Sequence, residues 1–375
     1  MHIKPFQMER WQSEHEHHVD INLSDSGVHP LRVSELIPDP EERARLLDRP
    51  LEYTQTNGTI PLRRRIAALY EGATPDHILA TSGGIEANFL SVWNLLRPGD
   101  EVVVMTPNYQ QIEGLAPAFG ARVVRWEMKP DWDSGQWVAD LDDLRQLVSP
   151  KTRLIAICNP NNPTGATFDG AWLDALASVA GEAWVLADEI YAGSELDGPP
   201  TPSMWGRHPR VIVTNSLSKA YGLPGLRLGW VATTEEKATE LWKHHDYTTI
   251  APSALSDTLA IAALEPERRQ WLLARTRELL KANLDEVCAW LDQRTDGLRY
   301  IRPRAGGMMW LAYRDATNST VLAERLREEA SVLVVPGDQY GMDGWLRIGF
   351  GGELAHVHEG LARIHALWDG AASGA

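Results

Sequence analysis

The chain has 375 residues, of which 43% are hydrophobic, so it is long enough to bury one large core or two unequal ones. Lysine and arginine number 36 against 51 aspartate and glutamate residues, which gives a formal net charge of −15. This composition excludes disordered chains and small disulfide-stapled scaffolds, and the negative charge argues against binding to nucleic acid or to an anionic membrane.

The cysteines and histidines predict neither a disulfide framework nor a metal site. Cys158 and Cys288 are too few for such a framework and lie in no zinc-like spacing. The histidines at positions 15, 17 and 18 lack the accompanying carboxylate or cysteine spacing. No apolar run resembles a signal peptide or is long enough to span a bilayer. We therefore expect a reducing, cytoplasmic compartment and no membrane partner.

Residues 1–45 are predicted to form an N-terminal arm. The segment opens with an amphipathic stretch through Phe6 and Trp11 and is broken at Gly27 and Pro30. We expect this arm to pack against the active site and the smaller of two domains.

From about residue 53 to residue 227, helical stretches alternate with short β-branched runs. Five such runs lie at 101–105, 121–126, 153–158, 184–188 and 210–216. Strands separated by helices favour a mostly parallel sheet with helices on both faces. The sequence therefore predicts a large α/β domain over residues 46–285.

The C-terminal part indicates a smaller α+β domain over residues 286–375. A long helical region at roughly 253–293, interrupted near Pro266, leads into a strand at 307–313 and a helix at 319–329. The apolar runs SVLVVPG and WLRIGF follow this helix.

Two features in the first half of the large domain suit a flat, phosphorylated ligand. Gly83 and Gly84 stand where a helix is expected to begin, and glycines let backbone amides and the helix dipole approach a phosphate. Tyr109, which follows the strand at 101–105, could stack on a flat ring. Taken alone, a Gly-Gly pair is more often a simple turn and such a tyrosine more often a half-buried core residue.

Polar residues follow two predicted strands, at the sheet edge where ligands bind in open α/β folds. The segment NPNNPTG at 159–165, which contains Asn162, fixes a turn and aims amide donors at the end of its strand. Asp188 ends the apolar run WVLA, where a buried carboxylate needs a cation or strong donors. A protonated pyridine nitrogen would supply that cation.

Lys219 lies in SLSKAYGLPGLRLGW (216–230), directly after another predicted strand. A buried ammonium is costly unless it is paired, and a Schiff base would neutralise it. Arg347 alternates with apolar neighbours on a late strand, where a guanidinium suits either a ligand carboxylate or a structural ion pair. A lone lysine is usually an ordinary surface residue, but the combined set predicts pyridoxal 5'-phosphate (PLP) as the ligand.

These motifs together resemble the fold type I PLP-dependent enzymes, specifically the class I/II aminotransferases, over almost the whole chain. The resemblance implies that Lys219 forms the internal aldimine and shuttles protons, and that Asp188 pairs with the pyridine nitrogen. Asn162 and Tyr191 would hydrogen-bond the phenolic oxygen of PLP, and Tyr109 would stack on its ring and belong to the catalytic set.

The same resemblance assigns the phosphate of PLP and the carboxylate of the substrate. The phosphate would be bound by the turn at Gly83 and by Gly84, Ile85, Ser216 and Arg227. The α-carboxylate of an amino acid would be bound by Arg347 and the backbone of Gly27, with help from Asn162.

A partner and a reaction are implied as well. Tyr53 matches a tyrosine that reaches the phosphate of the neighbouring subunit, which implies a homodimer with shared active sites. The expected reaction moves the α-amino group of an L-amino acid to a 2-oxo acid, with released Lys219 as the base.

The arm departs from the usual aminotransferase pattern, which has a Gly-x-Pro turn. It reads INLSDSGVHPL, with His29 next to Pro30, and together with SLSKAYGLPGLRLGW and HDYTTIAPSAL it is similar to capreomycidine synthases and PLP-dependent arginine oxidases. His29 over the cofactor would be a second acid or base. The alternative function is a PLP-dependent lyase, cyclase or oxygen-using oxidase or hydroxylase of an amino acid such as L-arginine.

The sequence leaves the roles of several arm residues open. The acidic residues of the arm, at positions 14, 16, 20 and 25, could neutralise a cationic substrate side chain or form a solvated face, and His29 could be an exposed residue with no role. A third possible function is that of a non-catalytic binding protein with this fold. The presence of Lys219 argues against it, because a pure binding protein need not retain this lysine. Side-chain specificity depends on pocket shape, which the sequence does not give.

Overall fold

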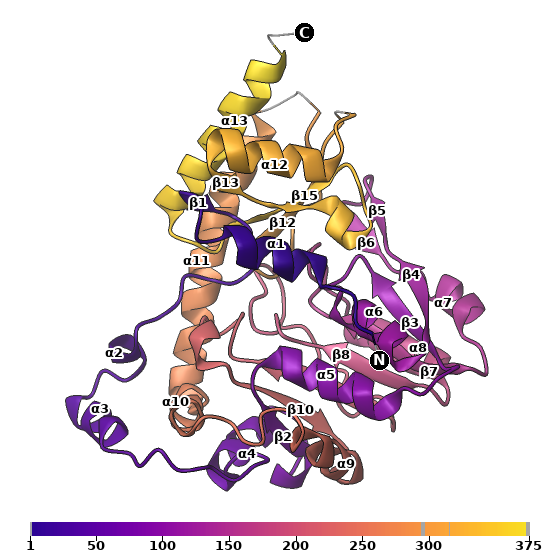
Figure 1. Ribbon diagram of the computed structural model, residues 1–375, viewed down its shortest axis with the longest axis vertical. Helices are drawn as coiled ribbons and strands as arrows, with labels where there is room; N and C mark the ends of the chain where they lie inside the picture. Colours follow the sequence, from indigo (N-terminus) through magenta and orange to yellow (C-terminus); the bar gives the residue numbers. More distant parts are fainter. Residues whose placement is uncertain (1, 294–296, 315, 373–375) are drawn as a thin grey trace.

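A computed structural model describes residues 2–293, 297–314 and 316–372 of the chain. A large sheet with its helices forms the lower part of the molecule, and a small sheet with its helices forms the upper part (Figure 1). The predicted architecture, a mostly parallel sheet with helices and a smaller α+β part, is present.

The large sheet has seven strands. Their spatial order is β2 (Ile78–Thr81), β10 (Gly229–Thr233), β9 (Val211–Ser216), β8 (Trp184–Asp188), β7 (Thr152–Cys158), β3 (Glu101–Thr106) and β4 (Arg122–Glu127). The strands from β9 to β4 are parallel and are the five that the sequence predicts, whereas β10 runs antiparallel to both neighbours. The strand β2 was not predicted, because its four residues are all buried and show no alternation.

Helices cover both faces of this sheet, because successive side chains of a strand point to opposite sides. Val102 and Val104 of β3 pack in one core with α5 (Gly84–Leu95), α6 (Gln111–Leu115) and α9 (Glu235–His245). Val103 and Met105 pack in the opposite core. That core includes residues of α4 (Ile60–Ala67), α7 (Leu141–Leu147), α8 (Gly170–Ala180) and α10 (Ala254–Ala263).

The small sheet is antiparallel and builds the upper core. Its order is β11 (Arg299–Tyr300), β12 (Met308–Ala312), β15 (Trp345–Gly349) and β14 (Val335–Pro336). The helices α12 (Ser319–Ala330) and α13 (Leu354–Ala372) cover it. The strand predicted at 307–313 and the helix predicted at 319–329 are therefore present. A separate hairpin joins β5 (Lys129–Asp131) to β6 (Gln136–Val138).

One long helix, α11 (Pro266–Asp292), belongs to both cores. Leu272 and Leu273 pack in the core of the large sheet, and Leu280 and Leu284 pack in the core of the small sheet. The helix begins at the predicted interruption. The predicted boundary between residues 285 and 286 falls inside this helix, and the division into 1–45, 46–285 and 286–375 stays a prediction.

The N-terminal segment joins the two parts. Its elements are α1 (Gln7–His15), β1 (Ile21–Asn22), α2 (Val33–Leu36) and α3 (Pro40–Leu47), and Figure 1 shows α1 lying between the large and small sheets. The strand β1 pairs in parallel with β13 (Val332–Leu333). The following stretch is tied to the end of β15, since the Gly349 N–H donates to the Leu23 carbonyl and the His29 N–H donates to the Gly351 carbonyl, both at 2.6 Å.

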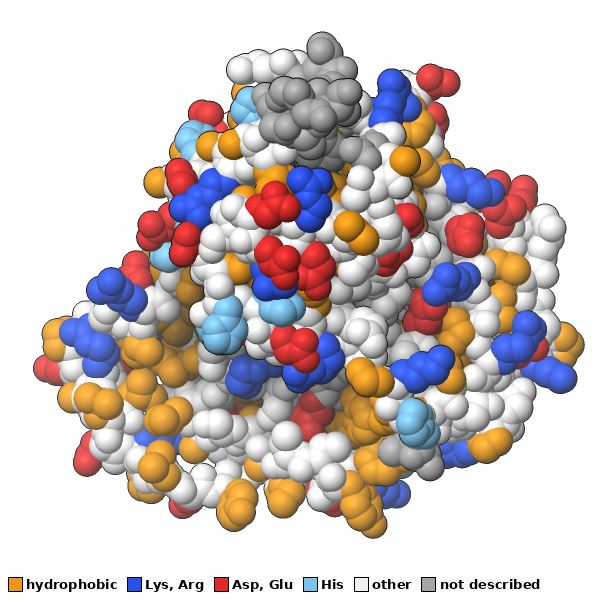
Figure 2. Space-filling model, turned by 45° about the horizontal axis from the view of Figure 1, so that its top comes forward, with side chains coloured by type: hydrophobic (Ala, Val, Ile, Leu, Met, Phe, Trp, Pro, Cys, Tyr) orange, Lys and Arg blue, Asp and Glu red, His pale blue; other side chains and the backbone are white. Residues whose placement is uncertain are grey.

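The connection between α3 and α4 carries exposed apolar side chains. Leu51 and Tyr53 are each 83% exposed, and Leu47, the last residue of α3, is 86% exposed. Figure 2 shows apolar side chains gathered along the lower part of one face, below a region where charges of both signs are scattered. No helix in the described ranges is apolar and long enough to cross a bilayer.

Because the arm packs closely against Gly351, a larger side chain at this position should destabilise the protein. A methyl group on Gly351 would overlap the carbonyl oxygen of Gly27, so Gly351→Ala is expected to lower the free energy of unfolding by about 1–3 kcal/mol. Urea unfolding measures this difference. Gly352→Ala is the matched control, because its added methyl group meets no atom within 4 Å. Equal stability of the two variants would contradict tight docking of the arm.

Candidate active site

A cavity of about 230 Å³ opens at the carboxyl ends of the parallel strands, where side chains of the arm and of β15 meet the large sheet. Nine predicted site residues line it: Gly84, Ile85, Tyr109, Asn162, Asp188, Tyr191, Lys219, Arg227 and Arg347. Residues between positions 84 and 347 are thus brought to one place. Those that follow the parallel strands of the large sheet meet because these strands end at one edge of the sheet.

Asp188 is the last residue of β8 and lies at the base of the cavity. Burial raises the pKa of its carboxyl group to about 6, while hydrogen bonds from Asn88 and from the backbone of Ile190 oppose that rise. Asn88 Nδ2 donates to Oδ2 at 2.9 Å, and the Ile190 N–H donates to Oδ1 at 3.1 Å. Both donors are neutral amides, so a protonated ring nitrogen is the kind of group that would complete this site.

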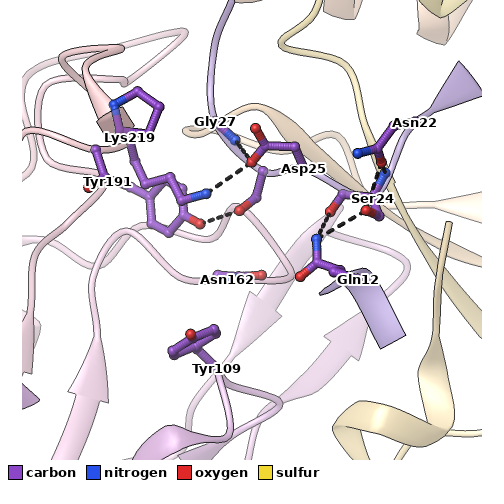
Figure 3. Close-up of polar contacts among 12 residues, drawn as sticks. Gln12, Asn22, Ser24, Asp25, Gly27, Tyr109, Asn162, Tyr191 and Lys219 are labelled. Atoms are coloured by element: carbon purple, nitrogen blue, oxygen red, sulfur yellow. Dashed lines mark hydrogen bonds and ion pairs between the residues drawn. The ribbon is translucent and has the colours of Figure 1, made fainter. Parts of the chain in front are cut away.

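Lys219 follows the end of β9 by three residues and reaches the arm. Its Nζ donates to Asp25 Oδ1 at 3.0 Å, as Figure 3 shows. The same oxygen accepts the Gly27 N–H at 2.9 Å. The Lys219 ammonium lowers the pKa of Asp25 to about 2. Asp25 therefore pairs with the lysine in this structure, a partner that differs from both alternatives left open by the sequence, a cationic substrate side chain and a solvated face.

The start of α5 forms a turn suited to a phosphate. Gly83 has a φ of +84°, and a Cβ there would lie 2.8 Å from Arg227 Nη2, so the guanidinium of Arg227 lies over the first turn of the helix. The amides of Gly84 and Ile85 open this helix, where no intrahelical acceptor exists. Ser216 is buried and accepts the Ser218 N–H at 3.1 Å, and of these two serines Ser218 lines the cavity.

Arg347 and Asn162 form one cluster, as predicted for a carboxylate site. Arg347 Nη1 donates to Asn162 Oδ1 at 3.0 Å and to the hydroxyl of Tyr340, and Nη2 donates to the Ser24 carbonyl at 2.5 Å. The Nε of Arg347 is buried and has no hydrogen-bond partner within the described part of the chain. A buried donor without a partner is costly, so a ligand oxygen is the natural complement.

Residues of the arm hydrogen-bond to the two tyrosines that line the cavity. The Tyr191 hydroxyl lies 2.8 Å from Ser26 Oγ, and burial raises the pKa of Tyr191. The Tyr109 hydroxyl donates to Glu9 Oε1 at 2.7 Å, and its ring packs on Phe6 with centroids 4.9 Å apart. In the view of Figure 3, Tyr109 lies across the site from Tyr191.

Five predicted residues do not line this cavity. Gly27 and His29 line a neighbouring cavity of about 340 Å³, where His29 Nε2 lies 3.7 Å from Glu353 Oε1. Tyr53 is exposed on the connection between α3 and α4. Gly83 and Ser216 lie directly beside the cavity without lining it. The roles given to all these residues stay predictions.

Three of the four acidic arm residues considered as partners of a cationic substrate form pairs outside the cavity. Asp20 lies 2.9 Å from Arg363, Glu14 lies 2.9 Å from Arg10, and Glu16 lies 3.5 Å from His17. Of the four acidic residues that could face a cationic substrate, these three are thus engaged elsewhere. Within the described ranges, no group of His, Cys, Asp or Glu side chains is arranged to hold a metal ion.

Sequence reasoning missed several residues that line the cavity, namely Glu9, Gln12, Ser26, Asn88 and Ser218. Asn88 follows Gly84 by four residues, and residues four apart share one face of a helix. This spacing could have predicted that Asn88 lies on the same face of the helix as Gly84 and therefore near the site. Glu9 and Gln12 are one turn apart on α1, but nothing local shows which face of a short arm helix meets the site.

The donor set fits PLP. Arg227 and the amides at the start of α5 suit a phosphate dianion, and Asp188 suits a protonated ring nitrogen. Lys219 supplies a primary amine for an aldehyde carbon. Arg347, with its free buried Nε, would bind the carboxylate of an amino acid.

Comparisons with known proteins find similar sequences and folds over nearly the whole chain. The family model for aminotransferase class I and II matches residues 31–364. The chain is 33% identical to capreomycidine synthase of Streptomyces vinaceus over 365 residues, which cover 95% of this chain and 92% of that protein. A PLP-dependent aminotransferase from Streptococcus suis superposes with a TM-score of 0.90 at 34% identity, covering 97% of each chain. A PLP-dependent cyclase superposes with a TM-score of 0.87 at 27% identity, covering 98% of this chain and 97% of the cyclase.

Proposed function

The chain belongs to the aminotransferase class I and II family, whose cofactor is PLP, and from that premise we propose that it transfers the α-amino group of an L-amino acid to a 2-oxo acid. The observation that carries this proposal is the meeting of Lys219, Asp188 and Arg347 in one cavity. These residues supply an amine, an anion for the ring nitrogen and a cation for the substrate carboxylate.

The side chains then divide the chemical work. Bound PLP supplies an aldehyde carbon that bonds the substrate nitrogen and a protonated ring that withdraws electrons from the α-carbon. Lys219 Nζ would take the proton from the α-carbon of the substrate and hold it as an ammonium until the proton is returned. Asp25, 3.0 Å from Nζ, stabilises the ammonium form that Lys219 has between these two steps.

Binding groups fix the substrate while the proton moves. Arg347 and Asn162 orient the α-carboxylate, and Asp188 presents an anion to the ring nitrogen. Tyr109 closes the cavity together with Glu9 of the arm and reduces the access of water. The arm is therefore part of the proposed active site, because its residue Glu9 holds Tyr109.

The partner in this proposal is a second copy of the chain. Tyr53, 83% exposed, would reach the phosphate site of the neighbouring subunit, and Tyr247, 82% exposed, adds to the apolar surface available for contact. A solution mass of two chains would support the homodimer, and a monomer would contradict it. A cytoplasmic location stays a prediction.

A second candidate function is cyclisation, elimination or oxidation of an amino acid such as L-arginine. The 33% identity to capreomycidine synthase favours it, as does the structural likeness to a PLP-dependent cyclase. His29 would then act as a further acid or base from the neighbouring cavity, which Asp25 also lines.

The absorbance spectrum of the PLP-loaded protein separates the two functions. L-Amino acids, including arginine, are added one at a time, first without oxygen and then in air. Conversion to the aminated cofactor, reversed by a 2-oxo acid, supports the aminotransferase. Oxygen consumption, or release of a cyclised product while the original cofactor spectrum returns, assigns the second function. Absence of any bound-cofactor band would overturn both.

A substitution at Arg347 tests the carboxylate site. Arg347→Gln is expected to raise KM for the amino acid by about 30-fold or more, because a buried cation is removed from its anionic partner. Arg347→Lys keeps the charge without the planar fork and should fall between this variant and the parent. Steady-state kinetics give KM, and thermal unfolding shows whether both variants are folded. An unchanged KM in folded Arg347→Gln would remove Arg347 from the substrate site.

A further inference from the structure

Asn88 is a buried amide on a helix that is otherwise rich in apolar residues. It lies on the second turn of α5 and is 3% exposed. Burying an amide costs free energy unless its hydrogen bonds are made. Asn88 makes three: Nδ2 donates to Asp188 Oδ2 at 2.9 Å and to Gln111 Oε1 at 3.2 Å, and Oδ1 accepts from Thr214 Oγ1 at 2.7 Å.

The neighbours of Asn88 fix the direction of its amide. Gln111 uses its own Nε2 to donate to the Ile85 carbonyl at 2.6 Å, so it presents Oε1 as an acceptor to Asn88. The Thr214 hydroxyl donates to the oxygen of Asn88 from the opposite side. Asn88 therefore has its two N–H donors turned toward Gln111 and Asp188.

This network joins three parts of the candidate site. Ile85 belongs to the turn that would bind the phosphate, Gln111 follows Tyr109 by two residues, and Asp188 is the carboxylate that would meet the ring nitrogen; all three line the cavity. Burial raises the pKa of Asp188 to about 6, and the hydrogen bond from Asn88 opposes that rise. A donor that favours the charged carboxylate keeps the shared proton on the ring nitrogen instead of on Asp188.

We infer that Asn88 is a positioning residue that keeps Asp188 ionised and turned toward the ring nitrogen of the cofactor. Asn88 acts through Asp188 and its hydrogen-bond network, not on the reacting carbon. The inference rests on the cofactor of the family and not on the choice between transamination and cyclisation, since both need a protonated ring.

The test measures ring protonation without any substrate. PLP labelled with ¹⁵N in the ring is bound to the parent protein, to Asn88→Leu and to Asn94→Leu, and the ¹⁵N chemical shift is followed with pH. Asn88→Leu keeps a similar volume but loses the donor, so its ratio of protonated to unprotonated nitrogen is expected to fall by about tenfold. Asn94→Leu is the control, because Asn94 is buried on the same helix but contacts Lys237.

A second variant keeps the inference testable if Asn88→Leu does not fold. Thr214→Val preserves shape and removes the hydroxyl that orients the Asn88 oxygen, so it should shift ring protonation in the same direction by a smaller factor. Equal ring protonation in the parent and in every folded variant would overturn the inference. Because no amino acid is present, such a failure is distinct from failure of the proposed reaction.

Discussion

Lys219→Ala is expected to abolish turnover while the protein stays folded. The variant loses both the amine that bonds the cofactor and the base that moves the α-proton. The second role alone contributes about 10²–10⁴-fold in comparable enzymes. Steady-state assays with the best substrate of the amino-acid panel measure the loss, and the bound-cofactor band should change in the same variant.

The control for this variant is Lys281→Ala. Lys281 pairs with Asp197 at 2.7 Å, and its side chain is 50% exposed, so removing it should leave turnover near that of the parent. Adding a small primary amine such as methylamine is expected to restore part of the activity of Lys219→Ala. If Lys219→Ala retained turnover close to that of the parent, Lys219 would not be the base.

Asp188→Asn is expected to lower kcat by about 10²–10³-fold, the range seen when one electrostatic contact to developing charge is removed. The neutral amide no longer favours a protonated ring nitrogen, so the ring draws electrons from the α-carbon less strongly. Steady-state kinetics measure the loss. Glu189→Gln is the matched control, because Glu189 is a buried carboxylate on the next residue that does not line the cavity. Similar losses in both variants would point to a structural effect.

The same carboxylate predicts a pH effect on the cofactor-free protein. Burial raises the pKa of Asp188 from 3.8 to about 6, so the folded state favours the protonated form. This stabilising contribution is complete below about pH 4 and is lost as the pH rises through 6. Relative to Asp188→Asn, the parent should lose up to about 3 kcal/mol of unfolding free energy between these conditions. Urea unfolding at pH 4 and pH 7 gives the difference, and a pH-independent difference would contradict it.

Some site residues could be predicted from the sequence because their signal is local. Asp188 and Asn162 each follow a buried run, and Lys219 follows another, so strand ends alone bring them to one edge of the sheet. The antiparallel strand β10 and the short β2 carry no such pattern.

Other contacts depend on how distant segments dock, which no local pattern encodes. Asp25 meets Lys219 across 194 residues of sequence, and Asn88 meets Asp188 across 100. The sequence left open whether His29 lies over the cofactor or is an exposed residue, and the path of the arm along Gly351 brings it beside Glu353. A shift of the arm by one residue would change which side chain faces the lysine, and only the docked backbone determines that.

The continuous helix α11 packs against both halves of the molecule, so its tilt affects their relative position. Its 27 residues make a rod of about 40 Å, so a tilt of about 5° around one end displaces the other end by about 3–4 Å, more than the length of a hydrogen bond. The large sheet, which bears Lys219, packs at one end of the rod, and the small sheet, which bears Arg347, packs at the other. The distance between Lys219, which would bond the amine, and Arg347, which would bind the carboxylate, therefore depends on the tilt of α11, so packing around its first turns would affect how well both groups hold one α-amino acid at the same time.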